Sequence, residues 1–334
     1  MDYRSAGVDI DAATRAVGKI RELARSTFRP EVLSDIGSFG GLFRLDTSRY
    51  RRPVLVASTD GVGTKLKIAI AARRNESVGY DLVSHCINDI LVQGARPLFF
   101  LDYLAMGKLD TDVAASVISG MAEACREFGL ALLGGETAEM PGFYQAGDYD
   151  IAGTIVGVVE EDRILDGSRV REGDRLVALE SWGLHTNGYS LARKIFFEQE
   201  GLEPSAHVAA IGGTVADVLL ARHRCYLREL EPLLDTEVLH AMAHITGGGL
   251  TDNVPRVLPS GLGVRIDRST LRPLPVFRYM KEKGAVPEDD MLRTFNMGVG
   301  MVVIVAPEDS ARIPGGWTIG EVVPGSGVSY EGTL

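Results

Sequence analysis

The chain has 334 residues, of which 45 % are hydrophobic and 24 % charged, which is typical of a folded protein and excludes a fibre, a coiled coil or a disordered chain. Its 35 basic and 45 acidic side chains give a formal net charge of −10, which argues against nucleic acid as a partner because a phosphate backbone would be repelled. The 39 glycines exceed by about 16 the number expected at an average usage of about 7 %.

The sequence shows no sign of export or of a membrane span. Its first residues lack the apolar core of a secretory signal, and apolar runs such as 299–306 are far shorter than the ~20 residues that cross a bilayer. Cys86, Cys125 and Cys225 are far apart and form no Cys-x-x-Cys pair. We therefore expect a cytoplasmic protein with buried, reduced thiols and no membrane partner.

Strands and helices alternate along the first half of the chain. Apolar spacing predicts a first helix over 11–27, and a loop rich in glycine and proline follows over 29–52. The further predicted strands are 54–59, 97–106, 130–133 and 149–159, and the further helices are 77–93 and 112–128.

The second half repeats this alternation after a turn-rich segment at 160–173. The predicted strands are 175–180, 238–243, 263–266 and 297–305, and the helices are 188–199, a pair within 214–234 and one opening near Gly248. The pattern predicts an α/β protein with mixed sheets and two domains, 1–165 and 166–334.

A glycine-rich turn follows the first predicted strand. In the segment STDGVGTK (58–65), Gly61 and Gly63 let backbone N–H groups approach an anion, Lys65 adds a positive charge, and Asp60 could hold Mg²⁺. The segment is neither a Walker A loop, which needs Gly-Lys-Ser/Thr, nor a dinucleotide-binding fingerprint. The alternative is a structural turn with a surface lysine.

Two further acidic positions extend this candidate site. Asp89 lies near the end of an apolar helix, where a carboxylate is costly to bury unless it is paired or bound to a metal; the alternative is an exposed polar edge. In GGETAEMP (134–141), Gly135 precedes Glu136 after a short strand. Asp60, Asp89 and Glu136 could together hold Mg²⁺ beside phosphate oxygens.

A second metal site is also compatible with the sequence. Asp81, His85 and Asp89 fall at positions i, i+4 and i+8, so they could line one stripe of the predicted helix as metal ligands. A single triplet of this kind often arises by chance.

Two motifs in the second half combine histidine with glycine. GLHTNGYS (183–190) holds His185 and Asn187 before a predicted helix, although a lone histidine is more often structural than catalytic. HITGGG (244–249) begins with His244, and Gly247, Gly248 and Gly249 at a helix N-terminus are a candidate phosphate cradle. The residues thus indicate a nucleotide–Mg²⁺ site in the first half and a site that recognises phosphate and amide groups in the second.

Taken together, these blocks resemble the phosphoribosylformylglycinamidine cyclo-ligase family, also called aminoimidazole ribonucleotide synthetases. Asp89-x4-Gly94-Ala95-x-Pro97 matches a signature of the wider superfamily, and Ala13 stands where the family usually has glycine. The matching blocks run almost end to end, at 6–11, 58–65, 88–102, 134–142, 184–190, 244–249 and 293–300.

The resemblance implies a ligase of purine biosynthesis. Formylglycinamidine ribonucleotide would be closed to 5-aminoimidazole ribonucleotide, with ATP converted to ADP and phosphate, through an O-phosphorylated iminophosphate. It also implies a homodimer joined by the N-terminal domains, which would bind ATP and Mg²⁺, while the C-terminal α/β domain would complete the active-site cleft.

The family's functional positions carry over motif by motif. The resemblance places Asp60, Asp89 and Glu136 at Mg²⁺–ATP, with Asp89 also catalytic and Lys65 near the phosphates. The glycine-rich segment 37–41, which includes Gly40, would fold over the nucleotide as a flap. The remaining implied ligand-binding positions are Gly61, Gly63, Gly135, Asn187, Gly247, Gly248 and Gly249.

The resemblance implies a less specific role for the histidines. His185 and His244 would orient the formyl group or move protons. Two alternatives from other classes stay open: a kinase or selenophosphate synthase of the same superfamily, and a non-enzymatic nucleotide sensor. The absence of a cysteine before Cys86 disfavours the synthase, and the intact acidic set disfavours the sensor.

Overall fold

The computed structural model describes residues 10–334, of which residues 10–17 are described by their backbone alone. The motif block at 6–11 therefore lies mostly outside the described residues. The described chain forms two compact units. The first unit runs to Ile90 and continues over Ala95–Glu161, and the second unit comprises Leu91–Gly94 and Asp162–Leu334. The division lies close to the boundary expected after residue 165.

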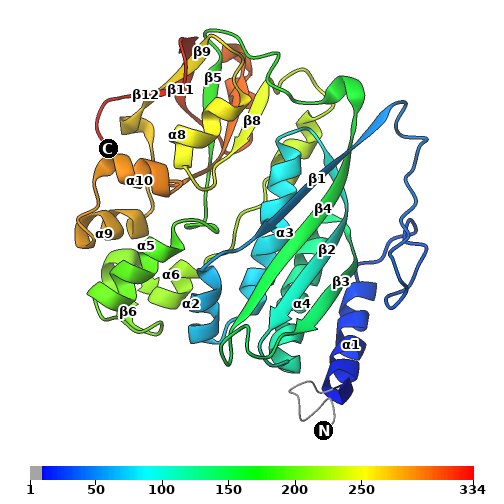
Figure 1. The fold of residues 1–334 in the computed structure, drawn as a ribbon. Coiled ribbons are helices and arrows are strands. Elements are labelled where there is room, and N and C mark those ends of the chain that lie inside the picture. Colours follow the sequence, from blue (N-terminus) through cyan, green and yellow to red (C-terminus); the bar gives the residue numbers. More distant parts are fainter. Residues whose placement is uncertain (1–9) are drawn as a thin grey trace. The chain divides into compact units, whose positions relative to one another are not determined.

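The first unit is a four-stranded sheet with helices against one face (Figure 1). The strand order is β1-β4-β2-β3, with β4 antiparallel to both of its neighbours and β2 parallel to β3. The strands are β1 (Pro53–Gly61), β2 (Arg96–Met106), β3 (Ala131–Glu139) and β4 (Tyr149–Glu160). The helices are α1 (Ile10–Arg25), α2 (Lys65–Ala72), α3 (Glu76–Leu91) and α4 (Thr111–Phe128).

Helices α3 and α4 cross at two glycines. A Cβ atom on Gly79 would lie 2.0 Å from the carbonyl oxygen of Val117, and one on Gly120 would lie 1.9 Å from that of Glu76. Only glycine permits this approach, because any side chain would collide with the backbone of the facing helix. The crossing fixes the position of α3, the helix that carries Asp81, His85 and Asp89.

The second unit contains a six-stranded mixed sheet with the order β12-β9-β11-β5-β10-β8. Its strands are β5 (Arg175–Glu180), β8 (Ala241–His244), β9 (Leu262–Asp267), β10 (Val299–Val305), β11 (Trp317–Pro324) and β12 (Val328–Glu331), and β6 (His207–Val208) pairs separately with β7 (Gly213–Thr214). Strand β10 lies between β5 and β8 and is buried along its whole length.

The second unit also contains six short helices among its described residues. They are α5 (Tyr189–Arg193), α6 (Val215–Leu219), α7 (Leu227–Leu230), α8 (Gly249–Asn253), α9 (Pro275–Lys283) and α10 (Glu288–Thr294). Helix α5 continues as a π-helix over Lys194–Gln199. Among residues 10–334, none of the helices combines the length and apolar character that a membrane span needs.

The α/β class with mixed sheets is confirmed, whereas the predicted end of one strand is wrong. Strand β3 was expected to end at Leu133, but it runs on to Glu139 because Gly134 and Gly135 pair with Leu101 and Asp102 of β2. Glycine marked a turn in the sequence, yet at a sheet edge it also fits an extended strand. The helix pair expected within 214–234 is present as the short helices α6 and α7.

Candidate active site

Two of the three predicted Mg²⁺ ligands lie together in the first unit. Asp60 near the end of β1 and Asp89 near the end of α3 both approach His85, whose Nε2 lies 2.8 Å from Asp60 Oδ2 and 3.5 Å from Asp89 Oδ2. The Ser58 hydroxyl donates to Asp89 Oδ2 at 3.1 Å. Among the described residues, Asp60, His85 and Asp89 form a group whose ligand atoms lie within 4.8 Å of one another.

Charge compensation holds this cluster together. Burial alone would lower the pKa of His85, but the hydrogen bonds and charges of Asp60 and Asp89 outweigh it and raise that pKa to about 9. Burial would likewise raise the pKa of Asp60, yet the His85 interaction holds it below its ordinary value. A protonated His85 thus occupies the place between two carboxylates where a cation could sit. The carboxylate and hydroxyl oxygens fit Mg²⁺, which prefers oxygen ligands.

Lys65 does not lie at the surface, contrary to the structural-turn alternative. Its ammonium is fully buried and lies 2.6 Å from the equally buried Asp81 carboxylate. Burial lowers the pKa of Lys65, while Asp81 opposes this shift. Asp81 therefore belongs to an ion pair in the core and not to the predicted metal stripe with His85 and Asp89. The side chain of Lys65 is directed into the core, so its expected place beside phosphates receives no support.

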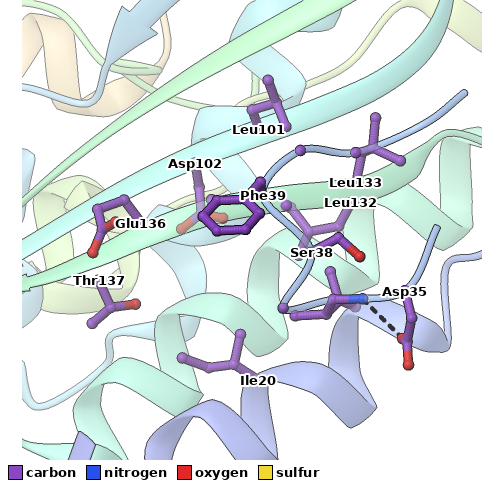
Figure 2. A pocket seen from close by; sticks show the side chains of 17 residues that line it. Ile20, Asp35, Ser38, Phe39, Leu101, Asp102, Leu132, Leu133, Glu136 and Thr137 are labelled. Atoms are coloured by element: carbon purple, nitrogen blue, oxygen red, sulfur yellow. Dashed lines mark hydrogen bonds between the residues drawn. The ribbon is translucent and has the colours of Figure 1, made fainter.

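A cavity of about 500 Å³ lies in the first unit between a glycine-rich loop and β3 (Figure 2). Ile20 and Ala24 of α1 contribute one wall, and the loop 35–41, with Ser38, Phe39 and Gly40, contributes another. Gly41 touches β3 so closely that a Cβ atom there would lie 2.4 Å from Leu133 Cγ. The segment predicted to cover a nucleotide therefore shares a cavity with the predicted ligand-binding residues Gly135 and Glu136.

Two carboxyl groups line the strand side of this cavity, as Figure 2 shows: Asp102 of β2 and Glu136 of β3. Desolvation is the main reason that the pKa of Asp102 is raised to about 7; a backbone hydrogen bond opposes the shift and the charge of Glu136 adds to it. A Cβ atom on Gly135 would lie 2.2 Å from Asp102 Oδ1, so glycine is required beside this carboxyl group. Sequence reasoning missed Asp102, which looks like an ordinary interruption of an apolar strand.

Glu136 does not join the cluster around Asp60 in the described structure. Across the sheet, Asp60 pairs with Gly153, Gly153 with Asp102, and Asp102 with Gly135. At about 4.8 Å per strand, three such steps separate Asp60 from β3 by roughly 14 Å. The single set of three acids expected from the sequence is therefore divided into two groups within the first unit.

The two predicted motifs of the second unit lie side by side. A Cβ atom on Gly247 would lie 3.2 Å from Asn187 Oδ1, which brings the GLHTNGYS and HITGGG segments into contact. The Asn253 side chain donates to the carbonyl oxygens of Gly247 and Gly249 at 3.0 and 2.9 Å. The triple-glycine loop is therefore held in one shape. Helix α8 that follows it has only five residues, so its dipole is weaker than the sequence suggested.

His185 and His244 both lie in the second unit and are buried. His185 has a left-handed backbone with φ +64°, an uncommon conformation for a non-glycine residue that often accompanies function. A third buried histidine, His223, stacks on His185 with ring centroids 4.0 Å apart. His223 was missed because it stands in the segment ARHRCY (221–226), which carries no recognisable motif.

Asn296 ties together the strand ends around these histidines. Its Nδ2 donates to the Gly183 carbonyl oxygen at 2.8 Å, and its Oδ1 accepts from the Ser181 hydroxyl and from Gly298 N. The sequence pointed to the block 293–300 only through its glycines. A buried amide that satisfies three groups at once can be recognised only when the strands are in place.

Comparison with known proteins covers nearly the whole chain. Family models described as "AIR synthase related protein" match residues 45–159 with the N-terminal domain and residues 171–331 with the C-terminal domain. A phosphoribosylformylglycinamidine cyclo-ligase of Geobacter sulfurreducens is 55 % identical over 309 residues, 92 % of this chain and 88 % of that protein. A relative of the same name from Xanthomonas oryzae is 50 % identical and covers 98 % of both chains.

The chain belongs to the phosphoribosylformylglycinamidine cyclo-ligase family.

Solved structures show that this family shares its fold with more distant proteins. Thiamine-monophosphate kinase from Stenotrophomonas maltophilia matches with a TM-score of 0.70 at 20 % identity, covering 95 % of this chain and 96 % of that one. The E. coli hydrogenase maturation protein HypE matches with a TM-score of 0.68 at 19 % identity, covering 96 % and 94 %. At such identities the likeness concerns the fold alone. The family resemblance and the two-domain mixed α/β fold expected from the sequence are thereby confirmed.

Proposed function

We propose that this chain closes the imidazole ring of formylglycinamidine ribonucleotide, using ATP and giving 5-aminoimidazole ribonucleotide, ADP and phosphate. This function rests on the sequence identity of 50 % or more, over nearly the full length, between this chain and cyclo-ligases of several bacteria. The chain is accordingly an ATP-dependent ligase of purine biosynthesis.

The reaction needs activation before ring closure. The formamide carbon resists attack because amide resonance makes its oxygen a poor leaving group. Transfer of the ATP γ-phosphoryl group to that oxygen releases ADP and forms an iminophosphate. The amidine nitrogen then forms the C–N bond, loses a proton, and the C–O bond breaks to release phosphate. Holding both reacting groups of one molecule together can contribute about 7–11 kcal/mol to lowering the barrier.

In this proposal Asp60 and Asp89 hold Mg²⁺ at the end of β1 and α3. Their support is the 2.8 and 3.5 Å approach to His85, whose raised pKa favours a positive charge at this position. When bound, Mg²⁺ would neutralise charge on the transferring phosphoryl group. The Gly61 N–H donates to Asp60 Oδ1 at 2.7 Å and so orients this carboxylate, whereas the backbone at Gly63 in the following turn would face phosphate. Asp89 is also the residue that we expect catalysis to need most.

We assign the nucleotide to the cavity between loop 35–41 and β3. Its apolar wall suits a purine base, and its volume is within the usual range for small-molecule sites. Gly40 of the loop and Gly135 of β3 would approach the nucleotide by their backbones, and Glu136 would contact it through its carboxylate. Because Glu136 lies roughly 14 Å from Asp60 across the sheet, we treat it as a separate contact and not as a third ligand of the same ion.

The second unit would handle the phosphorylated substrate. Asn253 fixes the loop of Gly247, Gly248 and Gly249 through two of its carbonyl oxygens, and Asn187 lies against Gly247. The backbone of this loop would approach the phosphate group of the substrate. His185 and His244 are then available to orient the formyl group or to move the amidine proton. Both are buried, which strengthens their interactions with a bound ligand.

We further propose that the chain is a homodimer and acts in the cytoplasm. The four-stranded sheet has α3 and α4 on one face only, and its other face carries Leu55, 61 % exposed, and Tyr103, 40 % exposed. Apolar side chains that reach water from a sheet face favour pairing with a second copy. The three cysteines are buried and free of disulfides, which supports a reducing compartment.

The decisive experiment is an assay with formylglycinamidine ribonucleotide, ATP and Mg²⁺ that detects the aminoimidazole product. Asp89→Asn removes one carboxylate charge without changing shape, so we expect product formation to fall at least 100-fold while the circular dichroism spectrum is unchanged. Asp110→Asn, at the exposed start of α4, is the matched control and should remain active. Absence of product from the wild type with intact ATP binding would refute the proposed function.

A further inference from the structure

Three buried histidines meet in the second unit, and His223 stands between the other two. Its ring stacks on that of His185 at 4.0 Å and 22°. On its far side, His223 Nε2 lies 3.0 Å from His244 Nε2, a direct hydrogen-bond distance. His185 and His223 are fully shielded from solvent, and His244 is 6 % exposed.

We propose that His223 is a positioning residue for this reaction: it fixes the ring orientation and the proton location of His244 and supports the ring of His185. The inference deepens the proposed function, because it rests on His185 and His244 acting on the formyl and amidine groups. His223 itself needs no contact with substrate.

The proton arrangement follows from the hydrogen-bond chain. One of two facing imidazole nitrogens must carry a hydrogen and the other must accept it. The Asn187 amide donates to Thr186 Oγ1, and that hydroxyl lies 3.5 Å from His223 Nδ1. If the hydroxyl donates onward to Nδ1, His223 keeps its hydrogen on Nε2 and donates it to His244. Neutral His244 is then protonated on Nδ1, the nitrogen that faces away from His223.

The surrounding backbone makes the arrangement rigid. The segment that carries His223 is anchored to the end of β5 by two bonds to the Glu180 carbonyl oxygen, from Tyr226 Oη and from Arg224, each 2.9 Å long. On the other side, a Cβ atom on Gly300 would lie 2.4 Å from His185 Cε1 and 1.9 Å from Tyr226 Oη. Strand β10 therefore approaches so closely that the rings of His185 and Tyr226 have no room to turn away.

Packing against His185 alone would not require a histidine at position 223. A phenyl ring would fill the same place against His185 without bringing two nitrogens into the protein interior. The Nε2–Nε2 bond stabilises the fold little in net terms, since both groups must first be desolvated, but it selects one tautomer of His244. Fixing the tautomer of an acid–base histidine through its second nitrogen is a general way to prepare it for proton transfer.

The test separates ring shape from nitrogen chemistry. His223→Phe keeps a ring against His185 but cannot bond His244, so we expect kcat to fall about 10- to 100-fold with the KM for ATP changed less than about twofold. His223→Gln offers an amide N–H to His244 and should recover most of the lost kcat. His207→Phe, an exposed histidine on β6, is the matched control and should behave as wild type.

If His223 only filled space, His223→Phe would be fully active and His223→Gln impaired, which would overturn the proposal. Circular dichroism and thermal unfolding of both variants show whether they fold. Should His223→Phe unfold, the contrast between His223→Gln and His223→Leu decides, because leucine fills similar volume without a donor and should lose kcat.

A second readout does not depend on activity. The chain has six histidines, so ¹⁵N-histidine labelling with single substitutions allows each ring to be assigned by NMR. We expect His244 to be a single Nδ1-protonated tautomer in the wild type and a mixture in His223→Phe. Identical His244 signals in both proteins would overturn the proposal. Suppose that the wild type makes no aminoimidazole product but that His223→Phe still changes the His244 tautomer. This result would refute the proposed function, whereas the positioning of His244 by His223 would stand.

Discussion

At the scale of single residues, the first unit shows how charges are kept inside a protein. Lys65 and Asp81 lie in full burial 2.6 Å apart, and each ion compensates the desolvation of the other. His85 does the same for Asp60 and Asp89 nearer the surface. The two groups differ in exposure. The shielded pair holds α2 to α3, whereas Asp60 and Asp89 are partly exposed and are the carboxylates at which we propose Mg²⁺.

The buried ion pair makes a strong prediction for stability. Lys65→Met leaves the Asp81 carboxylate without its cation in the interior, so we expect the free energy of unfolding to fall by about 3–5 kcal/mol in urea titrations. Lys67→Met is the matched control: its ammonium is 44 % exposed beside Asp148, and its removal should cost less than about 1 kcal/mol. A loss at position 65 as small as at 67 would show that the pair is not buried in solution.

At the scale of secondary-structure elements, the approach of α3 to α4 positions the acidic cluster. The two helices touch through Gly79 and Gly120, and α3 then delivers His85 and Asp89 to the end of β1. Helix α4 is fixed at its own ends, where the Asp110 side chain accepts from Asp112 N and Val113 N and Gly129 adopts a left-handed conformation. Any change that separates α3 from α4 should therefore move His85 and Asp89.

Gly120→Ala tests this crossing. The new Cβ atom would lie 1.9 Å from the Glu76 carbonyl oxygen, so the helices must separate and we expect a loss of about 1–3 kcal/mol in unfolding free energy, together with lower activity. Gly18→Ala in α1 meets no atom within 4 Å and should instead stabilise the protein by about 0.5–1 kcal/mol through helix propensity. Equal behaviour of the two variants in urea titrations would contradict the close packing of α3 on α4 at Gly120.

At the scale of the whole molecule, Asp102 couples stability to pH. The folded carboxyl group releases its proton near pH 7 and the unfolded one near 3.8, so between these values the folded state holds the extra proton. Raising the pH through this window therefore destabilises the folded protein. Asp102→Asn mimics the protonated form, and its advantage over wild type should grow from pH 5 to pH 8 in metal-free urea titrations.

An exposed carboxylate provides the comparison for that experiment. The Ser48 hydrogen bonds hold the pKa of Asp46 below its ordinary value, so it stays ionised throughout pH 5–8. Asp46→Asn should therefore shift stability by an amount independent of pH. If Asp102→Asn behaved in the same way, Asp102 would not titrate near 7.

The uncovered face of the four-stranded sheet predicts the oligomeric state. Leu55→Asp places a charge on that face, and we expect analytical ultracentrifugation to show a shift from dimer towards monomer, because a second copy could no longer bury the position without desolvating the charge. Leu33→Asp changes an equally exposed leucine in the loop outside the sheet and serves as the control. A dimer unaffected by Leu55→Asp would place the interface elsewhere.

Much of this protein follows from its sequence alone. The alternation of apolar segments determined the α/β class, because period-2 and period-3.6 patterns are local properties of the chain. Strand β5 was predicted at its observed bounds, and α4 within one residue. The grouping of glycines with acidic residues and histidines also indicated the segments in which we propose the chemistry and, through the resemblance, the family.

Only the tertiary structure decided how those residues combine. It brought Asp60 and Asp89 to His85, buried Lys65 against Asp81, carried Glu136 to the far edge of the sheet, and placed His223 between His185 and His244. None of these outcomes has a local signal, because contacts between residues distant in sequence depend on strand order, register and helix crossing. The sequence names the reactive side chains, and packing determines which of them meet.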